Sequence, residues 1–224
     1  MVSRAKSKAQ QVQCANNVRQ LGIALQGYLA ENHAYPSKRR WQQILQESEL
    51  GAINTNSFLG ITQQGVWKCP NAYTPADYPE QGYVSYGYTW DGLESHGNWT
   101  NSLGLGGHVF SPNDWPVKES EVVSPSEMIA MGDGFAGGDN HIRDGVANLE
   151  RAYGILDFGG TARSFARHQG QANMVFCDGH VESPTLKFLF EDTSDAALAR
   201  WKTFRSGTMR TATNHLPRRE KLSP

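Results

Sequence analysis

The sequence predicts an α+β fold with a long helix at the N-terminus, followed by short strands joined by long, irregular loops. Three observations carry this prediction. Apolar residues recur at helical spacing over residues 14–28. Glycine, proline and asparagine interrupt short aromatic or β-branched runs after residue 50, and an Asp-Gly pair at 178–179 separates two short apolar runs. A length of 224 residues fits one large domain.

The N-terminal helix is predicted from near residue 3 or 7 to about residue 32, ahead of Tyr35-Pro36. Its apolar stripe has spacings of four, three, four and three residues, and comprises Cys14, Val18, Leu21, Leu25 and Tyr28. Gly22 and Gly27 interrupt this helix, and each costs about 1 kcal/mol relative to alanine. We expect them to let another backbone come close.

Two shorter helices are predicted further along the chain. The first follows Ser37, a good N-cap residue, and its apolar face consists of Trp41, Ile44 and Leu45. The second lies near the C-terminus, where Ser194 is the expected cap. Its apolar face consists of Ala197, Leu198, Trp201 and Phe204.

Strands are predicted in the middle of the sequence. Residues 126–133 read as a buried strand that ends at a Gly-Asp turn, and residues 173–183 read as a β-hairpin. Asp178-Gly179 suits a type I′ turn, which needs positive φ at both central positions. The segments 91–115 and 133–161 are long and rich in glycine, which is typical of functional or mobile loops.

The charges are distributed unevenly although the net charge is only −1. Residues 1–40 carry a local charge of +6, residues 41–160 carry −11 and residues 161–224 carry +4. The acidic body would repel phosphate, so we do not expect nucleic-acid binding. A phosphate-binding loop and a Gly-x-Ser-x-Gly nucleophile motif are both missing from the sequence. The sequence therefore offers no motif for nucleophilic catalysis.

Four segments, in this order, resemble bacterial type IV pilins and type II secretion pseudopilins that carry the prepilin-type processing-associated domain. The first is the helix at residues 14–28 with Tyr35-Pro36, and the next two are Trp67-Lys68-Cys69-Pro70 and Ser85-Tyr86-Gly87-Tyr88. The fourth is His168, followed after nine residues by Asp178-Gly179-His180, the His-x9-Asp-Gly signature. The resemblance extends from about residue 5 to residue 205.

This resemblance implies a pilin-like, non-catalytic structural subunit. Residues 1–34 would form a stem helix that packs on an antiparallel sheet of the head, residues 35–224, within the same single domain. The helix stripe would serve assembly with other pilin or pseudopilin subunits, and we call these residues the assembly stripe: Val18, Leu21, Leu25 and Tyr28. In full length the subunit would be processed by a prepilin peptidase and anchored in the inner membrane, with its head in the periplasm or at the cell surface. We expect the printed sequence to be its soluble part.

Composition leaves the state of Cys14, Cys69 and Cys177 open between one disulfide with a free thiol and three thiols. Cys14 and Cys69 fall on segments that carry the resemblance. If the head is exported, a disulfide between them is expected, and closing such a loop stabilises by about 4 kcal/mol. Cys177 is expected to be a small buried apolar residue.

His168, Asp178 and His180, with Asp133, also fit a zinc-ligand reading, which includes a metal-dependent hydrolase. The alternative is structural: His168 hydrogen-bonds a backbone carbonyl or Asp178, while Asp178, Gly179 and His180 form the turn. Calcium is a further alternative for the carboxylates of the loop at 133–144, which are Asp133, Asp139 and Asp144.

A different class of function, an exported glycan- or calcium-binding module, would use the loops at 83–115 and 133–145. Aromatic residues interleaved with polar ones suit glycan and protein interfaces, and equally the packing of a small sheet. The residues in question are Tyr83, Tyr86, Tyr88, Trp90, Trp99 and Trp115.

Overall fold

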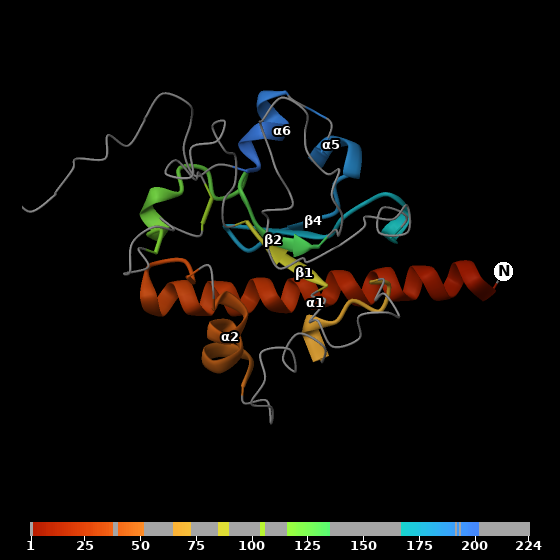
Figure 1. Ribbon diagram of the computed structural model, residues 1–224, viewed down its shortest axis with the longest axis horizontal. Coiled ribbons are helices and arrows are strands. Elements are labelled where there is room, and N and C mark those ends of the chain that lie inside the picture. Colours follow the sequence, from red (N-terminus) through yellow and green to blue (C-terminus); the bar gives the residue numbers. More distant parts are fainter. Residues whose placement is uncertain are drawn as a thin grey trace, which may run out of the picture.

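The computed structural model describes residues 2–37, 40–51, 65–72, 85–89, 104–105, 116–134, 167–190, 192 and 194–201. It confirms the predicted α+β class. A long helix, α1 (Val2–Asn32), contacts a four-stranded antiparallel sheet. Figure 1 shows α1 along one side of the sheet, with α5 (Leu186–Phe190) and α6 (Asp195–Ala199) on the other side.

The predicted stripe of α1 is the reason the helix packs on the sheet. The bounds of α1 agree with the prediction within a few residues, and His33, with φ of +52°, follows the last helical residue. The stripe meets β2, β3 and β4. Four members of the stripe are fully buried: Cys14, Val18, Leu21 and Leu25. Leu29, which was not part of the predicted stripe, is buried beside them. In proteins most of the stability of a helix comes from packing of its apolar face, so burial of this stripe supplies most of the stability of α1.

The second predicted helix is α2 (Trp41–Leu45), which continues as a π-helical turn, η1 (Gln46–Leu50), and ends at Gly51 with φ of +83°. The prediction that Ser37 is the N-cap residue is wrong. The helix begins three residues later than the sequence suggested, so Arg40 is the N-cap residue, and no side chain caps the helix. Trp41 stacks on Tyr88 of the sheet at 5.3 Å, which joins α2 to the head.

The sheet has the strand order β1-β2-β3-β4, with every neighbouring pair antiparallel. The strands are β1 (Tyr86–Tyr88), β2 (Ile129–Asp133), β3 (Met174–Phe176) and β4 (Val181–Glu182). In β2 the register against β3 shifts between Ile129 and Met131, which is a β-bulge.

All five residues of β2 are buried, because α1 covers one face of the sheet and the C-terminal helices lie over the other. Ile129 N donates to Arg200 O at 2.8 Å, directly after α6, and Trp201 is buried there. A strand covered on both faces reads as a continuous apolar run, which is how Met128-Ile129-Ala130-Met131 appears in the sequence.

The hairpin at 173–183 is present, but its turn differs from the prediction. Phe176 N donates to His180 O and Gly179 N donates to Phe176 O, both at 2.9 Å, so three residues rather than two connect the strands. Gly179 has φ of +88°. Among described residues other than glycine, positive φ occurs at His33, His168 and Gln169. Asp178 therefore lacks the positive φ of a type I′ turn, and the turn is a three-residue loop with glycine at its left-handed position.

The C-terminal helix α6 begins as predicted, since Ala197 N donates to the hydroxyl oxygen of Ser194 at 3.4 Å. Ala197 and Trp201 are buried, whereas Phe204 lies outside the described residues. The helix α5 was not predicted. Thr185 caps it by accepting from Phe188 N at 3.2 Å, and its five residues are too few to show a helical period in the sequence.

Candidate functional site: a buried disulfide, histidine and carboxylate

A disulfide joins the stem helix to the head. Cys14 lies on the buried face of α1, and Cys69 lies just after a 3-10 turn, η2 (Gly65–Trp67); the two sulfurs are bonded across 55 residues of sequence. Two further contacts attach this segment to α1 on either side of Cys69. Asn17 Nδ2 donates to Lys68 O at 2.9 Å, and Gln10 Nε2 donates to Pro70 O at 3.4 Å. The segment is thus held on the helix by hydrogen bonds as well as by the disulfide.

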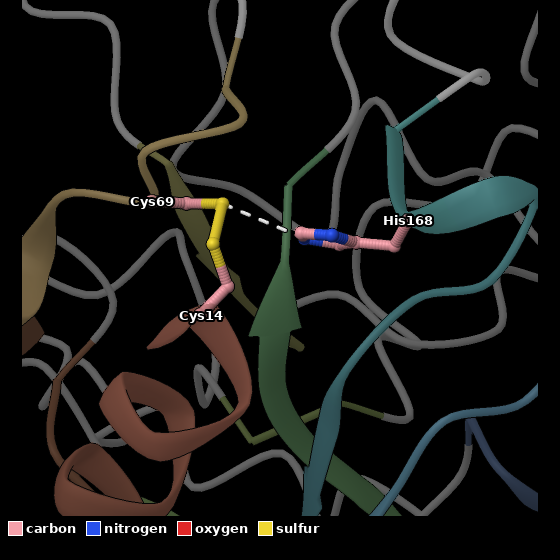
Figure 2. A group of neighbouring side chains, drawn as sticks. All are labelled: Cys14, Cys69 and His168. Carbon is pink, nitrogen blue, oxygen red and sulfur yellow. Dashed lines mark hydrogen bonds between the residues drawn. A yellow bond between two sulfur atoms is a disulfide. The ribbon is translucent and has the colours of Figure 1, made fainter. Parts of the chain in front are cut away.

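His168 lies directly beside this disulfide (Figure 2). It belongs to a 3-10 turn, η5 (Arg167–Gln169), and its side chain is fully buried. Its Nε2 atom is 3.5 Å from Sγ of Cys69. His168 has φ of +56°, a left-handed conformation that costs free energy for a residue with a Cβ. The surrounding structure maintains this conformation, which directs the imidazole toward the sulfurs.

Asp133, the last residue of β2, supplies a buried carboxylate to the same place. Its Oδ2 atom is 3.3 Å from His168 Nε2. The same oxygen accepts hydrogen bonds from Asn173, from the backbone N at 2.7 Å and from Nδ2 at 2.9 Å. Asn173 Oδ1 in turn accepts from the Ser183 hydroxyl at 2.9 Å. Asn173, directly before β3, therefore satisfies this buried carboxylate oxygen with two hydrogen bonds.

The contacts of His168 determine which nitrogen carries its proton. Because Nε2 faces a carboxylate oxygen, Nε2 is the protonated atom and donates toward Asp133. In the described part of the chain, the buried Nδ1 atom has no hydrogen-bond partner. With the sulfurs oxidised, neither cysteine carries a thiolate, so the cluster has no nucleophile and no sulfur ligand in this state. In this form it serves as a clamp between α1, β2 and η5.

The structure divides the His-x9-Asp-Gly signature between two places. His168 is in the buried cluster, whereas Asp178 and His180 contact each other at the partly exposed hairpin turn. His180 Nδ1 lies 2.5 Å from Asp178 Oδ1, and His180 Nε2 lies 3.4 Å from Glu182 Oε1. The expectation that His168 binds a carbonyl or Asp178 is wrong, because Asp133 and Cys69 occupy its Nε2 atom. Of the four residues expected to bind zinc, His168 and Asp133 lie together in the buried cluster, whereas Asp178 and His180 lie at the turn.

Several other predicted site residues fall outside the described part of the chain. Asp139 and Asp144, the remaining candidates for calcium, belong to this group, as do the aromatic residues Tyr83, Trp90, Trp99 and Trp115. Tyr86 and Tyr88 are described, and both are almost fully buried in β1. These two tyrosines pack in the core and do not form a glycan-stacking surface.

The assembly stripe is located in the core. Val18, Leu21 and Leu25 have no exposed surface, and Tyr28 is half-buried against the same cluster. The expectation that this stripe faces other subunits is therefore wrong, because the head of the same chain covers it. The exposed apolar side chains of α1 lie elsewhere: Val12 is 51% exposed and Ile23 is 66% exposed.

Cys177 is free and buried, as expected of a small apolar residue. Burial raises the pKa of its thiol to about 12, although a hydrogen bond with Tyr35 opposes the rise. Burial likewise raises the pKa of the Tyr35 hydroxyl. The sequence did not reveal this pair, nor the role of Asn173. For Asn173 the only signal was a polar residue at the start of an apolar strand.

We compared the chain with protein-family models, curated proteins and solved structures, and found no match in any of the three. No described helix is both long enough and apolar enough to cross a membrane. A disulfide such as Cys14–Cys69 is typical of proteins in oxidising compartments outside the cytoplasm. A long helix on an antiparallel sheet is compatible with a pilin-like fold and is also found in other α+β proteins.

Proposed function

We propose that this protein is an extracytoplasmic structural subunit of a pilin-like or pseudopilin-like assembly. In full length it would be anchored in the inner membrane after processing by a prepilin peptidase. The observation that supports the proposal is the difference between the two faces of α1. One face of this 31-residue helix is buried in its own head and clamped there by a disulfide, while the opposite face presents apolar side chains to solvent.

The exposed face of α1 would contact the neighbouring subunits. Val12 and Ile23 are eleven residues apart, which is about three helical turns, so they lie on the same side of the helix about 16 Å from each other. Exposed aliphatic side chains on a rigid helix suit packing against another apolar helix or groove. In this proposal the buried stripe builds the subunit, and the opposite face joins it to its partners.

Site-specific photocrosslinking in the source cells tests this proposal. A photoreactive residue at position 12 or 23 is expected to form crosslinks to other pilin-like subunits. Val123 provides the matched control, because it is an equally exposed aliphatic residue (61%) that lies outside α1. Absence of pilin-like partners at positions 12 and 23, or equal crosslinking at 123, would contradict the proposal.

The extracytoplasmic location has a separate test. Cell fractions are treated with an alkylating reagent under denaturing conditions, before and after reduction. An exported protein is expected to show one reactive thiol, Cys177, before reduction and three after it. Three reactive thiols in the unreduced cytoplasmic fraction of the mature protein would contradict export.

A further inference from the structure

We propose that the dithiol form of this protein binds one zinc ion through Cys14, Cys69 and His168, with Asp133 as the fourth ligand. This inference concerns the chain before its disulfide has formed, and it does not depend on the proposed function. The three sulfur and nitrogen atoms lie within 4.8 Å of one another, and all three residues are buried (Figure 2).

The ligand-to-ligand distances match those of a tetrahedral zinc ion. With zinc–nitrogen and zinc–oxygen bonds of about 2.0–2.1 Å and zinc–sulfur bonds of about 2.3 Å, a tetrahedron holds N and O about 3.3 Å apart, and S and N about 3.5 Å apart. The observed distances are 3.3 Å from His168 Nε2 to Asp133 Oδ2, and 3.5 Å from Nε2 to Cys69 Sγ. The two sulfurs would have to separate from bonded contact to about 3.8 Å.

The surrounding contacts keep these groups in place without the disulfide. Hydrogen bonds from Asn17 to Lys68 O and from Gln10 to Pro70 O attach the backbone on both sides of Cys69 to α1. Asn173 orients the Asp133 carboxylate through two donors. The left-handed backbone at His168 aims its imidazole at the same point. Metal sites depend on such supporting contacts to orient their ligands.

The donor set selects zinc rather than calcium. Two thiolates and an imidazole are ligands for zinc and other thiophilic ions, whereas calcium requires six or more oxygens. The sequence alone suggested His168 and Asp133 for zinc but paired them with Asp178 and His180, which lie at the partly exposed turn. The two cysteines replace these two residues because the fold brings α1 and the segment 65–72 to η5.

Binding needs no electron transfer. A newly made chain carries Cys14 and Cys69 as thiols, and Zn²⁺ replaces their two S–H protons, which pass to water. To bind the ion, His168 shifts its proton from Nε2, which faces Asp133 in the disulfide form, to Nδ1, so that Nε2 offers its lone pair. A disulfide-bearing oxidant can later accept two electrons from the two zinc-bound thiolates and two protons from water. The oxidant becomes a dithiol, the Cys14–Cys69 bond forms and Zn²⁺ is released. Zinc and disulfide are therefore mutually exclusive states of one site.

The experiment compares the two states of the full chain. Protein reduced with a phosphine in denaturant is refolded with one equivalent of zinc, passed through a desalting column and analysed for metal by mass spectrometry. The dithiol protein is expected to retain stoichiometric zinc and the disulfide protein to retain none. Cobalt in place of zinc is expected to give thiolate-to-metal charge-transfer bands and the strong visible bands of a tetrahedral site.

Variants identify the ligands. Cys14→Ser and His168→Ala are expected to weaken zinc binding at least tenfold, while Cys177→Ser, which changes a buried cysteine outside the cluster, leaves it unchanged. Because the ligand variants can fail to fold, alkylation of the unmodified dithiol protein provides a second measurement. Zinc is expected to protect Cys14 and Cys69 and to leave the slow reaction of Cys177 unaltered. No stoichiometric zinc, equal binding by the disulfide form, or loss of binding in Cys177→Ser would each overturn the proposal.

Discussion

Gly22 of α1 lies directly against Val175 of β3. A Cβ atom added at Gly22 would be 2.9 Å from Val175 Cγ2 and 3.2 Å from Cγ1. Val175 is fully buried in the centre of the sheet, and a β-branched side chain has little freedom to change rotamer. A glycine in the middle of a long helix is therefore required by the packing of the helix on the sheet. The sequence predicted the close approach of a backbone here, but the nearest group is the Val175 side chain, and the nearest backbone atom, Gly179 O, would be 3.6 Å from the added Cβ.

Replacement of this glycine is expected to destabilise the protein although alanine favours helices. In Gly22→Ala the gain in helix propensity, about 1 kcal/mol, is outweighed by overpacking against Val175, which costs about 1–3 kcal/mol. Gly27→Ala is the matched control, because the atoms nearest to its new methyl group belong to the carboxylate end of the flexible Glu49 side chain, which can move away. That variant is expected to be neutral or stabilised by up to about 1 kcal/mol. Urea unfolding measures both, and a Gly22→Ala variant as stable as Gly27→Ala would contradict the packing argument.

Two neighbouring aliphatic residues of α1 are expected to differ sharply in their effect on stability. Leu25 has no exposed surface, so Leu25→Ala removes buried methyl groups and should cost about 2–5 kcal/mol. Ile23 points to solvent, so Ile23→Ala should change the free energy of unfolding by less than about 0.5 kcal/mol. Thermal unfolding of the monomer distinguishes them. Equal losses would mean that the assignment of the two faces of α1 is wrong.

Loss of the disulfide is expected to destabilise the folded chain without abolishing the stem–head contact. The chain-entropy relation gives about 4 kcal/mol for a loop of 55 residues in the double variant Cys14→Ala/Cys69→Ala. The hydrogen bonds of Asn17 and Gln10 to the segment 65–72 should still hold it on α1. Chemical denaturation gives the free energy, with Cys177→Ala as the control that retains the disulfide. A double variant no less stable than this control would contradict the prediction.

Alkaline pH is expected to destabilise the protein partly through Cys177. Burial raises the pKa of this thiol from 9.0 to about 12, so the folded state keeps the proton that the unfolded chain loses. The corresponding stability is complete below pH 9 and declines as the pH rises from 9 to 12, at up to about 1.4 kcal/mol per pH unit. Cys177→Ala should therefore flatten the profile between pH 9 and 10. The phenol groups of Tyr35 and Tyr88, whose pKa values burial also raises, maintain a decline above pH 10 in both proteins.

The same burial predicts how the native protein reacts with thiol reagents. At pH 8 Cys177 should be alkylated far more slowly in the folded protein than in denaturant, because only the thiolate reacts and the site is closed to solvent. Reaction in the folded state at the denatured rate would contradict both the burial and the raised pKa.

Local patterns in the sequence determined several elements of this protein. The spacing of Cys14, Val18, Leu21 and Leu25 identified α1 and its buried face, because a helix presents one side to a core wherever it packs. The apolar run before Asp133 identified β2, and the Asp-Gly pair identified the hairpin. These signals arise from neighbours in the chain, so the sequence contains them directly.

Tertiary structure decided what those elements contact. The stripe faces the chain's own head rather than other subunits, since β2 and β3 lie against it. The signature residues His168 and Asp178 separate, one to a buried cluster and one to an exposed turn, because a left-handed backbone at His168 points its ring inward. The neighbours of His168 are Asp133 and Cys69, which come from distant segments. Sequence spacing carries no information on such contacts, because they depend on how the helix and the strands pack in three dimensions.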